Sequence, residues 1–337
     1  MGTKYGRKEL GSIFVWSTGN GGEEGILKDY CSYEGLVNNP WVIPVAGVTY
    51  DMKKLTSGEQ CSAIFITALT KNPNDTIHNI VTTEGFNGTT INFGRNSAAV
   101  PMVSGAIALA LQANPNLTYR DVMYLLVSTA RNTLPFDPYD FQTNGAGIKT
   151  SPTFGFGLLD IGALVQKSKT WTSISPVKTY TLKGMPVRLT GSICVEVKEH
   201  FYNFDKLEHV SLFISLRSDR AGFLTVILIS PCGTRSTLIP GRKIDRRKQL
   251  EINVTSVQFW GENPIGLWII QVEDNVKIEG NVITWELNLL GIKSNVLPMQ
   301  CLKGNRTCNN EKIGAENFHG YFTKEYLEER LGRKKER

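Results

Sequence analysis

The sequence NFGRNSAAVPMVSGA, residues 92–106, places a serine after a glycine-containing turn and before a long run of small and apolar residues. From Ala98 to Ala113 only Ser104 and Gln112 are plainly polar, which predicts a helix buried on nearly all faces. The run is too short to span a bilayer. At the start of such a helix, unpaired N–H groups and the helix dipole favour negative charge, so Ser97 suits a nucleophile whose attack creates an oxyanion. The alternative is an ordinary N-cap serine.

A second stretch, IFVWSTGNGG at residues 13–22, is an apolar strand that runs into a glycine-rich turn. Asn20 in that turn can direct its amide into a cleft, as an oxyanion-hole donor must. Together with LALQANPNLTYRDV (109–122) and FGFGLLD (154–160), these stretches resemble the subtilisin-like serine proteases, specifically the furin/kexin proprotein convertases. The resemblance implies an α/β fold with a doubly wound parallel sheet, with Ser97 as nucleophile and Asn20 as oxyanion-hole donor.

The chain changes character near Trp171. From Lys178 onward it shows alternating apolar patterns with turn signals and no long helix, which predicts a β-sandwich or barrel. The motifs SPCGTRS (230–236) and WGENPIGLW (260–268) resemble the convertase P domain. We therefore expect three parts. They are the C-terminal part of a peptidase domain (1–170), a P domain with a β-sandwich or jelly-roll fold (171–292) and a polar extension (293–337).

The expected catalytic triad is incomplete in this sequence. A serine hydroxyl needs a histidine to take its proton and a carboxylate to orient that histidine. In convertases both precede the oxyanion asparagine, and residues 1–19 contain neither aspartate nor histidine. None of the four histidines matches the family motif: His78, His200, His209 and His319. We expect this chain to lack the catalytic Asp and His, to be inactive alone, and to present an unpaired sheet edge and exposed apolar helix faces.

The turn before the serine departs from the family. Subtilases read Gly-Thr-Ser where this chain reads Arg95-Asn96-Ser97, or else one residue is inserted after Gly94. Arg95 could obstruct the close approach that glycine allows, while Asn96 could still donate to an oxyanion.

Other positions carry over by resemblance. Cys31 and Cys61 match a convertase disulfide, which fits a secretory compartment. Asp29 and Glu59 match ligands of a Ca²⁺ ion, whose preferred donors are carboxylate oxygens. Glu34 matches an acid at the base of the pocket that takes a substrate arginine. Solvated loop carboxylates are the alternative for these three acids. The resemblance also implies that the segment Ser17, Thr18 and Gly19 binds the substrate.

The remaining cysteines have no determined pairing. Cys194 matches a P-domain cysteine whose family partner position is Tyr180 here, so Cys194 is expected to be unpaired. Cys232 replaces an apolar residue. Cys301 and Cys308 could close a small loop in the extension.

The family resemblance and the glycosylation sequons, not a targeting signal, predict a secretory protein. A net charge of +6 is mild, and the basic run near Arg337 reads as a solvated end, so no nucleic-acid partner is expected. Neither a signal peptide at Met1 nor a transmembrane segment is visible. Five N-x-[ST] sequons fit a glycoprotein of the Golgi, secretory granules or extracellular space. They lie at Asn74, Asn87, Asn116, Asn253 and Asn305.

The resemblance implies a calcium-dependent serine endoprotease that processes secretory precursors after paired basic residues. Its implied partners are basic-motif precursors and its own propeptide. One alternative is a catalytically inactive homologue that binds basic peptides or regulates an intact convertase. Another is a β domain that acts as an interaction module beside a protease remnant.

Overall fold

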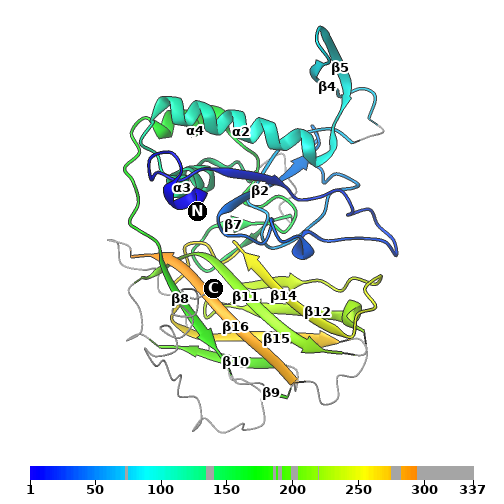
Figure 1. Cartoon of the computed structure of the whole chain (residues 1–337), viewed down its shortest axis with the longest axis vertical. Coiled ribbons are helices and arrows are strands. Elements are labelled where there is room, and N and C mark those ends of the chain that lie inside the picture. Colours follow the sequence, from blue (N-terminus) through cyan, green and yellow to red (C-terminus); the bar gives the residue numbers. More distant parts are fainter. Residues whose placement is uncertain are drawn as a thin grey trace, which may run out of the picture.

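The computed structural model describes residues 1–72, 75–133, 140–184, 187–188, 192–198, 204–218, 220–274 and 282–293. In Figure 1 an α/β unit, a parallel sheet with its helices, lies above a β-sandwich, and a single connection after α4 joins the two. The upper unit is called the α/β layer below, and the sandwich is called the second layer. The predicted polar extension, apart from Lys293, lies outside the described residues, as do Cys301, Cys308, His200 and His319.

The α/β layer is built on a parallel sheet with the strand order β1–β2–β3. Its strands are β1 (Phe14–Ser17), β2 (Val42–Val48) and β3 (Ile66–Leu69). All seven residues of β2 are buried, because its two edges are paired and both of its faces are covered. The expected parallel α/β fold is confirmed.

Strand β1 forms one edge of this sheet. Among the described residues, only β2 pairs with it, and Phe14 and Trp16 are 46% and 47% exposed. These side chains line a shallow apolar hollow of about 400 Å³ together with Leu36 and Ser104. The expected open edge is therefore present in the described structure, and it is apolar as well as unpaired.

Three helices cover the sheet and each other: α2 (Arg95–Ala113), α3 (Tyr119–Thr129) and α4 (Ile161–Ser168). The buried face of α2 presents Ala99, Val103, Ala106 and Ala110 to the sheet at helical spacing. Beside this buried face, Leu109 is 48% exposed.

Each of the three helices begins after a defined N-cap, and that of α4 is Asp160, whose Oδ1 accepts the Ala163 N–H at 2.8 Å. Helix α2 starts at Arg95 and its N-cap is Gly94, so the alternative of Ser97 as an N-cap is wrong. Helix α3 begins with a capping box, in which the Asp121 N–H donates to Thr118 Oγ1 (3.1 Å) and the Thr118 N–H donates to Asp121 Oδ2 (2.8 Å).

By length and composition, α2 is the one helix among the described residues that could cross a membrane. Its buried face packs into the sheet core, which is also typical of the central helix of a folded domain.

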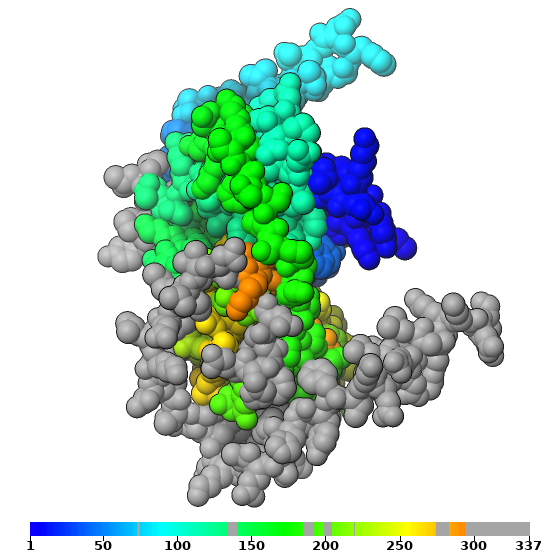
Figure 2. Space-filling view, turned by 90° about the vertical axis from the view of Figure 1, so that its left-hand side faces the viewer, coloured from blue at the N-terminus to red at the C-terminus, as the bar shows by residue number. Residues whose placement is uncertain are grey.

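Short elements complete this layer. They are α1 (Gly2–Tyr5), η1 (Cys31–Tyr33), β4 (Ile80–Glu84), β5 (Gly88–Phe93), β6 (Gln142–Thr143) and β7 (Lys149–Thr150). The β4–β5 hairpin, cyan in Figure 2, projects beyond the body of the molecule and carries the fully exposed Phe86 at its turn.

The second layer is all β, as expected. One sheet has the order β10–β15–β12–β13 and the other β14–β11–β16–β8, with β9 also paired to β16. Their buried faces share one core, which includes Leu212, Trp268 and Leu287. The bounds are β8 (Lys178–Lys183), β9 (Val187–Arg188), β10 (Ser192–Val197), β11 (Lys206–Arg217), η4 (Ala221–Phe223), β12 (Leu224–Ile229), β13 (Arg235–Ile239), β14 (Gln249–Ser256), β15 (Gly266–Asp274) and β16 (Val282–Ile292).

The two layers share buried contacts. Trp260, which follows β14, packs within the α/β core, with its ring 5.6 Å from the rings of Phe65 and Phe156 and 5.0 Å from that of Tyr124. Glu262 lies at the same boundary and accepts the Gly145 N–H at 2.8 Å. A P-domain-like segment thus completes the core of the α/β layer.

Burial raises the pKa of Glu262 above its ordinary value of 4.5, while hydrogen bonds to the carboxylate oppose this effect. A raised pKa in the folded state means that this carboxyl contributes stability below about pH 4.5, and that the contribution is lost as pH rises through the folded-state pKa. Glu262→Gln should therefore gain stability relative to wild type between pH 4 and pH 8. Urea unfolding midpoints at the two pH values measure this difference. The exposed Glu196→Gln is the control, and a pH-independent difference for Glu262→Gln would contradict the expectation.

Candidate active site

Ser97 is the third residue of α2 and is exposed, whereas the next two residues, Ala98 and Ala99, are buried. The buried alanines fix the helix against the sheet, so the serine side chain is held at the open N-terminal end of α2. At this end the helix dipole favours a developing negative charge.

Arg95 has a positive φ of 60° at the start of α2, a left-handed conformation that favours glycine. The Arg95 N–H donates to the Lys71 carbonyl (3.1 Å), and the Thr70 hydroxyl donates to the Arg95 carbonyl (2.7 Å). These two bonds hold a turn that costs on the order of 1–3 kcal/mol in backbone strain. The conformation is the one expected if Arg95 replaces the glycine of the family motif.

Asn96 joins the serine turn to strand β2 and to the turn that follows β1. Its backbone N–H donates to Asn20 Oδ1 (3.2 Å), and its buried side chain donates to the Gly19 carbonyl and accepts the Gly47 N–H (2.6 Å). The expectation that the Asn96 side chain donates to an oxyanion is therefore wrong, because its carboxamide is committed inside the protein. Asn20, in contrast, uses Oδ1 here, which leaves its Nδ2 as a donor beside the serine turn.

Asn96→Ala should lower the free energy of unfolding by about 1–3 kcal/mol, because the buried Gly47 N–H and the Gly19 carbonyl lose their partner. Urea denaturation measures the change. Asn92→Ala, at an exposed position of β5, is the matched control and should stay within about 0.5 kcal/mol of wild type. Equal effects of the two substitutions would show that the Asn96 contacts do not stabilise the turn.

Neither described histidine is placed as a base for Ser97. His78 Nδ1 lies 3.2 Å from Asp75 Oδ2, and its ring stacks on that of Tyr50. His209 is buried beside Trp260, and burial, reinforced by the Arg120 charge, lowers the pKa of His209 to about 3. His209 is therefore neutral at physiological pH and packs as an aromatic ring. In the part of the chain that the structure describes, no Asp–His pair bonds to Ser97.

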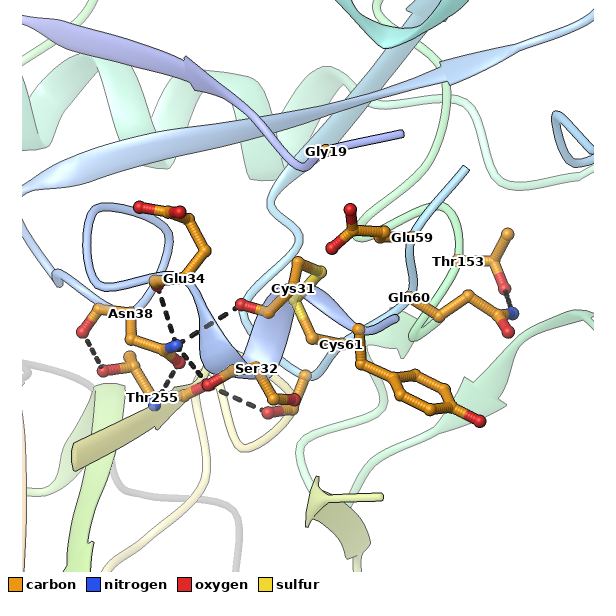
Figure 3. The surroundings of a disulfide bond; sticks show 12 residues. Gly19, Cys31, Ser32, Glu34, Asn38, Glu59, Gln60, Cys61, Thr153 and Thr255 are labelled. Carbon is orange, nitrogen blue, oxygen red and sulfur yellow. Dashed lines mark hydrogen bonds between the residues drawn. A yellow bond between two sulfur atoms is a disulfide. The ribbon is translucent and has the colours of Figure 1, made fainter. Parts of the chain in front are cut away.

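The Cys31–Cys61 disulfide brings two acidic segments together, as Figure 3 shows. Its Cα atoms are 5.3 Å apart. Glu59, two residues before Cys61, accepts the Gly21 N–H at 2.8 Å. Gly19 has φ +97°, a conformation that favours glycine, and an added Cβ would come 2.3 Å from Glu59 Oε1 and displace the carboxylate.

The acids of this region lie close enough to influence one another. Burial raises the pKa of Glu59, and the charges of Asp29 and Glu34 add to the effect, while the Gly21 N–H opposes it. Glu34 is exposed, and its Oε1 accepts the Leu36 N–H at 3.2 Å. The cluster can thus present negative charge to a cation or a basic side chain.

Asp29 and Glu59 fit a calcium site only as two of its ligands. Both approach Gly21, and carboxylate oxygens suit Ca²⁺. Among the described residues, however, no group of three or more acidic, histidine or cysteine side chains could hold a metal ion. Asp29 also pairs with Arg242 at 3.1 Å.

The three residues before Asn20 differ in accessibility. Ser17 ends β1, and its Oγ accepts the Gly19 N–H at 3.4 Å. Thr18 is fully buried, and its N–H donates to the Val45 carbonyl, so it presents no atom to a substrate in this structure. Of the three residues predicted to bind substrate, Ser17 and Gly19 are therefore partly accessible and Thr18 is not.

Cys194 and Cys232 are both disulfide-bonded. The expectation that Cys194 is unpaired is therefore wrong. The sequence could not predict that Cys194 is disulfide-bonded, because the spacing of cysteines does not determine their partners.

Comparisons with known proteins agree with this architecture. The sequence profile of the Subtilase family matches residues 1–157, and that of the Proprotein convertase P-domain matches residues 207–289. The chain is 36% identical over 308 residues to human proprotein convertase subtilisin/kexin type 6, covering 86% of this chain and 31% of that protein. It is 34% identical over 307 residues to furin of Rattus norvegicus, covering 87% of this chain and 38% of furin.

Among solved structures, a serine protease of Aeromonas sobria superposes with a TM-score of 0.73 at 21% identity, covering 84% of this chain and 65% of that one. This likeness concerns the fold. The fold and the two matched profiles define a subtilase-type domain followed by a convertase P domain. Within that class, the chain belongs to the proprotein convertase family. It spans about a third of the length of these two curated relatives.

Proposed function

We propose that this chain supplies the serine half of the active site of a convertase that cleaves secretory precursors after paired basic residues. The observation that carries the proposal is the exposed Ser97 at the N-terminal end of α2, beside Asn20, which is bonded to the adjacent Asn96 N–H. In this reading Ser97 attacks the scissile carbonyl and Asn20 Nδ2 stabilises the oxyanion. The proposed domain boundaries are a peptidase part at residues 1–170, a P domain at 171–292 and an extension at 293–337.

The proposed chemistry needs an aspartate and a histidine that the described residues do not place beside Ser97. The histidine takes the serine proton and returns it to the leaving amine, and the aspartate orients the histidine. Hydrolysis is therefore expected only where these two groups complete the site. The propeptide and the basic-motif precursors are the proposed partners, and the secretory pathway is the proposed location.

Glu34 is the proposed acid for the arginine side chain of the substrate, because it is an exposed carboxylate on the disulfide-linked segment. Asp29 and Glu59 are the proposed contributors to a Ca²⁺ site that is completed by other oxygens. Calcium there would hold the loops around Gly21 together, and it would compete with Arg242 for Asp29.

The decisive experiment isolates the native protein, maps its true N-terminus and mass, and assays an internally quenched peptide containing Arg-Arg, with calcium and with a chelator. We expect peptides from upstream of Met1, cleavage after the basic pair, and loss of this cleavage when Ser97→Ala is introduced into the recombinant protein of native length. Ser104→Ala, on the same helix, is the matched control and should retain cleavage. A native chain that begins at Met1 and hydrolyses nothing would overturn the protease proposal in favour of a binding role.

A further inference from the structure

The segment from Asp29 to Asn38, which carries Glu34, is held by side chains of the β-sandwich. Arg242 Nη1 donates to Asp29 Oδ1 (3.1 Å) and Oδ2 (3.4 Å). The Arg242 guanidinium also lies over the Tyr33 ring, 4.3 Å from its centroid. The Tyr33 hydroxyl donates to the Pro240 carbonyl at 3.0 Å. One loop of the sandwich therefore contacts the segment on both sides of Cys31.

This loop is itself fixed by Asp245, which is 5% exposed. Arg242 Nη2 lies 3.4 Å from Asp245 Oδ2, and Arg247 Nη2 lies 2.5 Å from the same oxygen. The Asp245 N–H also donates to the Arg242 carbonyl at 2.8 Å. Arg242 is thus oriented before it meets Asp29, which reduces the conformational entropy that the contact costs.

A second anchor comes from β14. The Thr255 N–H donates to Asn38 Oδ1 (3.0 Å), and the Thr255 hydroxyl donates to the Asn38 carbonyl (2.7 Å). The other end of the Asn38 carboxamide donates to the carbonyls of Ser32 (2.7 Å) and Glu34 (3.0 Å), as Figure 3 shows. Thr255 therefore orients the amide that holds the backbone at Glu34.

We propose that Arg242 and Thr255 are positioning residues for the Asp29–Asn38 segment, so that the β-sandwich shapes the site at which Glu34 meets a basic side chain. The identity of the ligand rests on the proposed function, whereas the positioning itself does not. The Glu34 carboxylate accepts the Leu36 N–H within its own loop, so the anchors on either side govern where Glu34 lies. Arg242 also offsets the mutual repulsion of Asp29 and Glu59.

Hydrogen exchange on the full 337-residue chain tests the positioning. Arg242→Gln and Thr255→Val should each speed amide exchange in residues 29–38 by about tenfold, with β2 unchanged. Arg242→Lys should restore part of the protection, since it keeps the charge but loses the fork geometry. Arg235→Gln, an exposed charge of the same sandwich, is the matched control. Unchanged exchange in residues 29–38 in both anchor variants would overturn the proposal, as would acceleration spread equally over β2.

Binding of p-aminobenzamidine, an amidinium compound, tests the effect on the site. Arg242→Gln and Thr255→Val should weaken its binding by about three- to tenfold, and Glu34→Gln should weaken it further. Loosening of residues 29–38 without any change in this affinity would overturn the link to Glu34. No binding to wild type would count against the arginine pocket of the proposed function, while the exchange result would still decide the positioning.

Discussion

Replacing Arg120 with alanine is expected to lower the free energy of unfolding by about 3–5 kcal/mol. Arg120 of α3 meets Glu208 of β11 across the boundary between the two layers, with their side chains 8% and 3% exposed. Arg120 Nε donates to Glu208 Oε2 at 3.1 Å, and Nη1 donates to the Ser175 carbonyl at 2.8 Å. Removing the guanidinium leaves a buried carboxylate without its counter-charge, which costs far more than the loss of an exposed pair.

The measurement is urea unfolding of the full chain at pH 7. Arg131→Ala is the matched control, because Arg131 pairs with Asp160 at 3.6 Å with its side chain 61% exposed. That pair should contribute about 0–1 kcal/mol. The double variant Arg120→Met/Glu208→Leu should recover much of the loss, since it removes both buried charges and keeps apolar volume. A single Arg120→Ala variant that is no less stable than Arg131→Ala would contradict this account.

Removing the Cys31–Cys61 disulfide is the second large effect. The double variant Cys31→Ala/Cys61→Ala should lose about 2–5 kcal/mol, because the bond closes a loop with a sequence separation of 30 and restricts the unfolded chain. Both cysteines are also buried, at 0% and 5% exposure, so the substitution leaves space in a packed cluster.

Urea unfolding and hydrogen exchange measure this second effect together. Exchange should rise most in the segments that the bond joins, around Cys31 and Glu59, and least in the sandwich core at Leu212. The apolar substitution Ile64→Val, at a fully buried position of the same cluster, is the control and should cost about 0.5–1.5 kcal/mol. A disulfide variant that loses no more stability than Ile64→Val would contradict the expectation.

Several helices and strands could be predicted from the local spacing of apolar residues. Helix α2 covers the predicted run from Ala98 to Ala113 and begins three residues before it, at Arg95, because the turn at Gly94 provides the cap. Strand β12 (Leu224–Ile229) lies in the region after Lys178 that was predicted to form strands. The spacing of apolar residues that defines each of these elements extends over only a few residues, so it can be recognised in a single sequence.

The arrangement of the candidate site could be predicted only in part from the sequence. The adjacency of Asn20 and the serine turn was expected from the family resemblance, and the structure joins them through the Asn96 N–H. The inward direction of the Asn96 carboxamide and the burial of Thr18 were not foreseen. An asparagine amide or a threonine hydroxyl can form hydrogen bonds with solvent or with backbone groups, and the surrounding tertiary structure decides which of these partners it meets.

By itself, therefore, the sequence determined the class of fold, the helix that carries Ser97, the all-β second layer and the family. Only the tertiary structure decided how the two layers join. Arg120 meets Glu208 across 88 residues, Arg242 meets Asp29 across 213, and Thr255 meets Asn38 across 217. Spacing along a helix or strand encodes which face is buried, but the partner of a charged or polar side chain depends on which distant surface folding brings beside it.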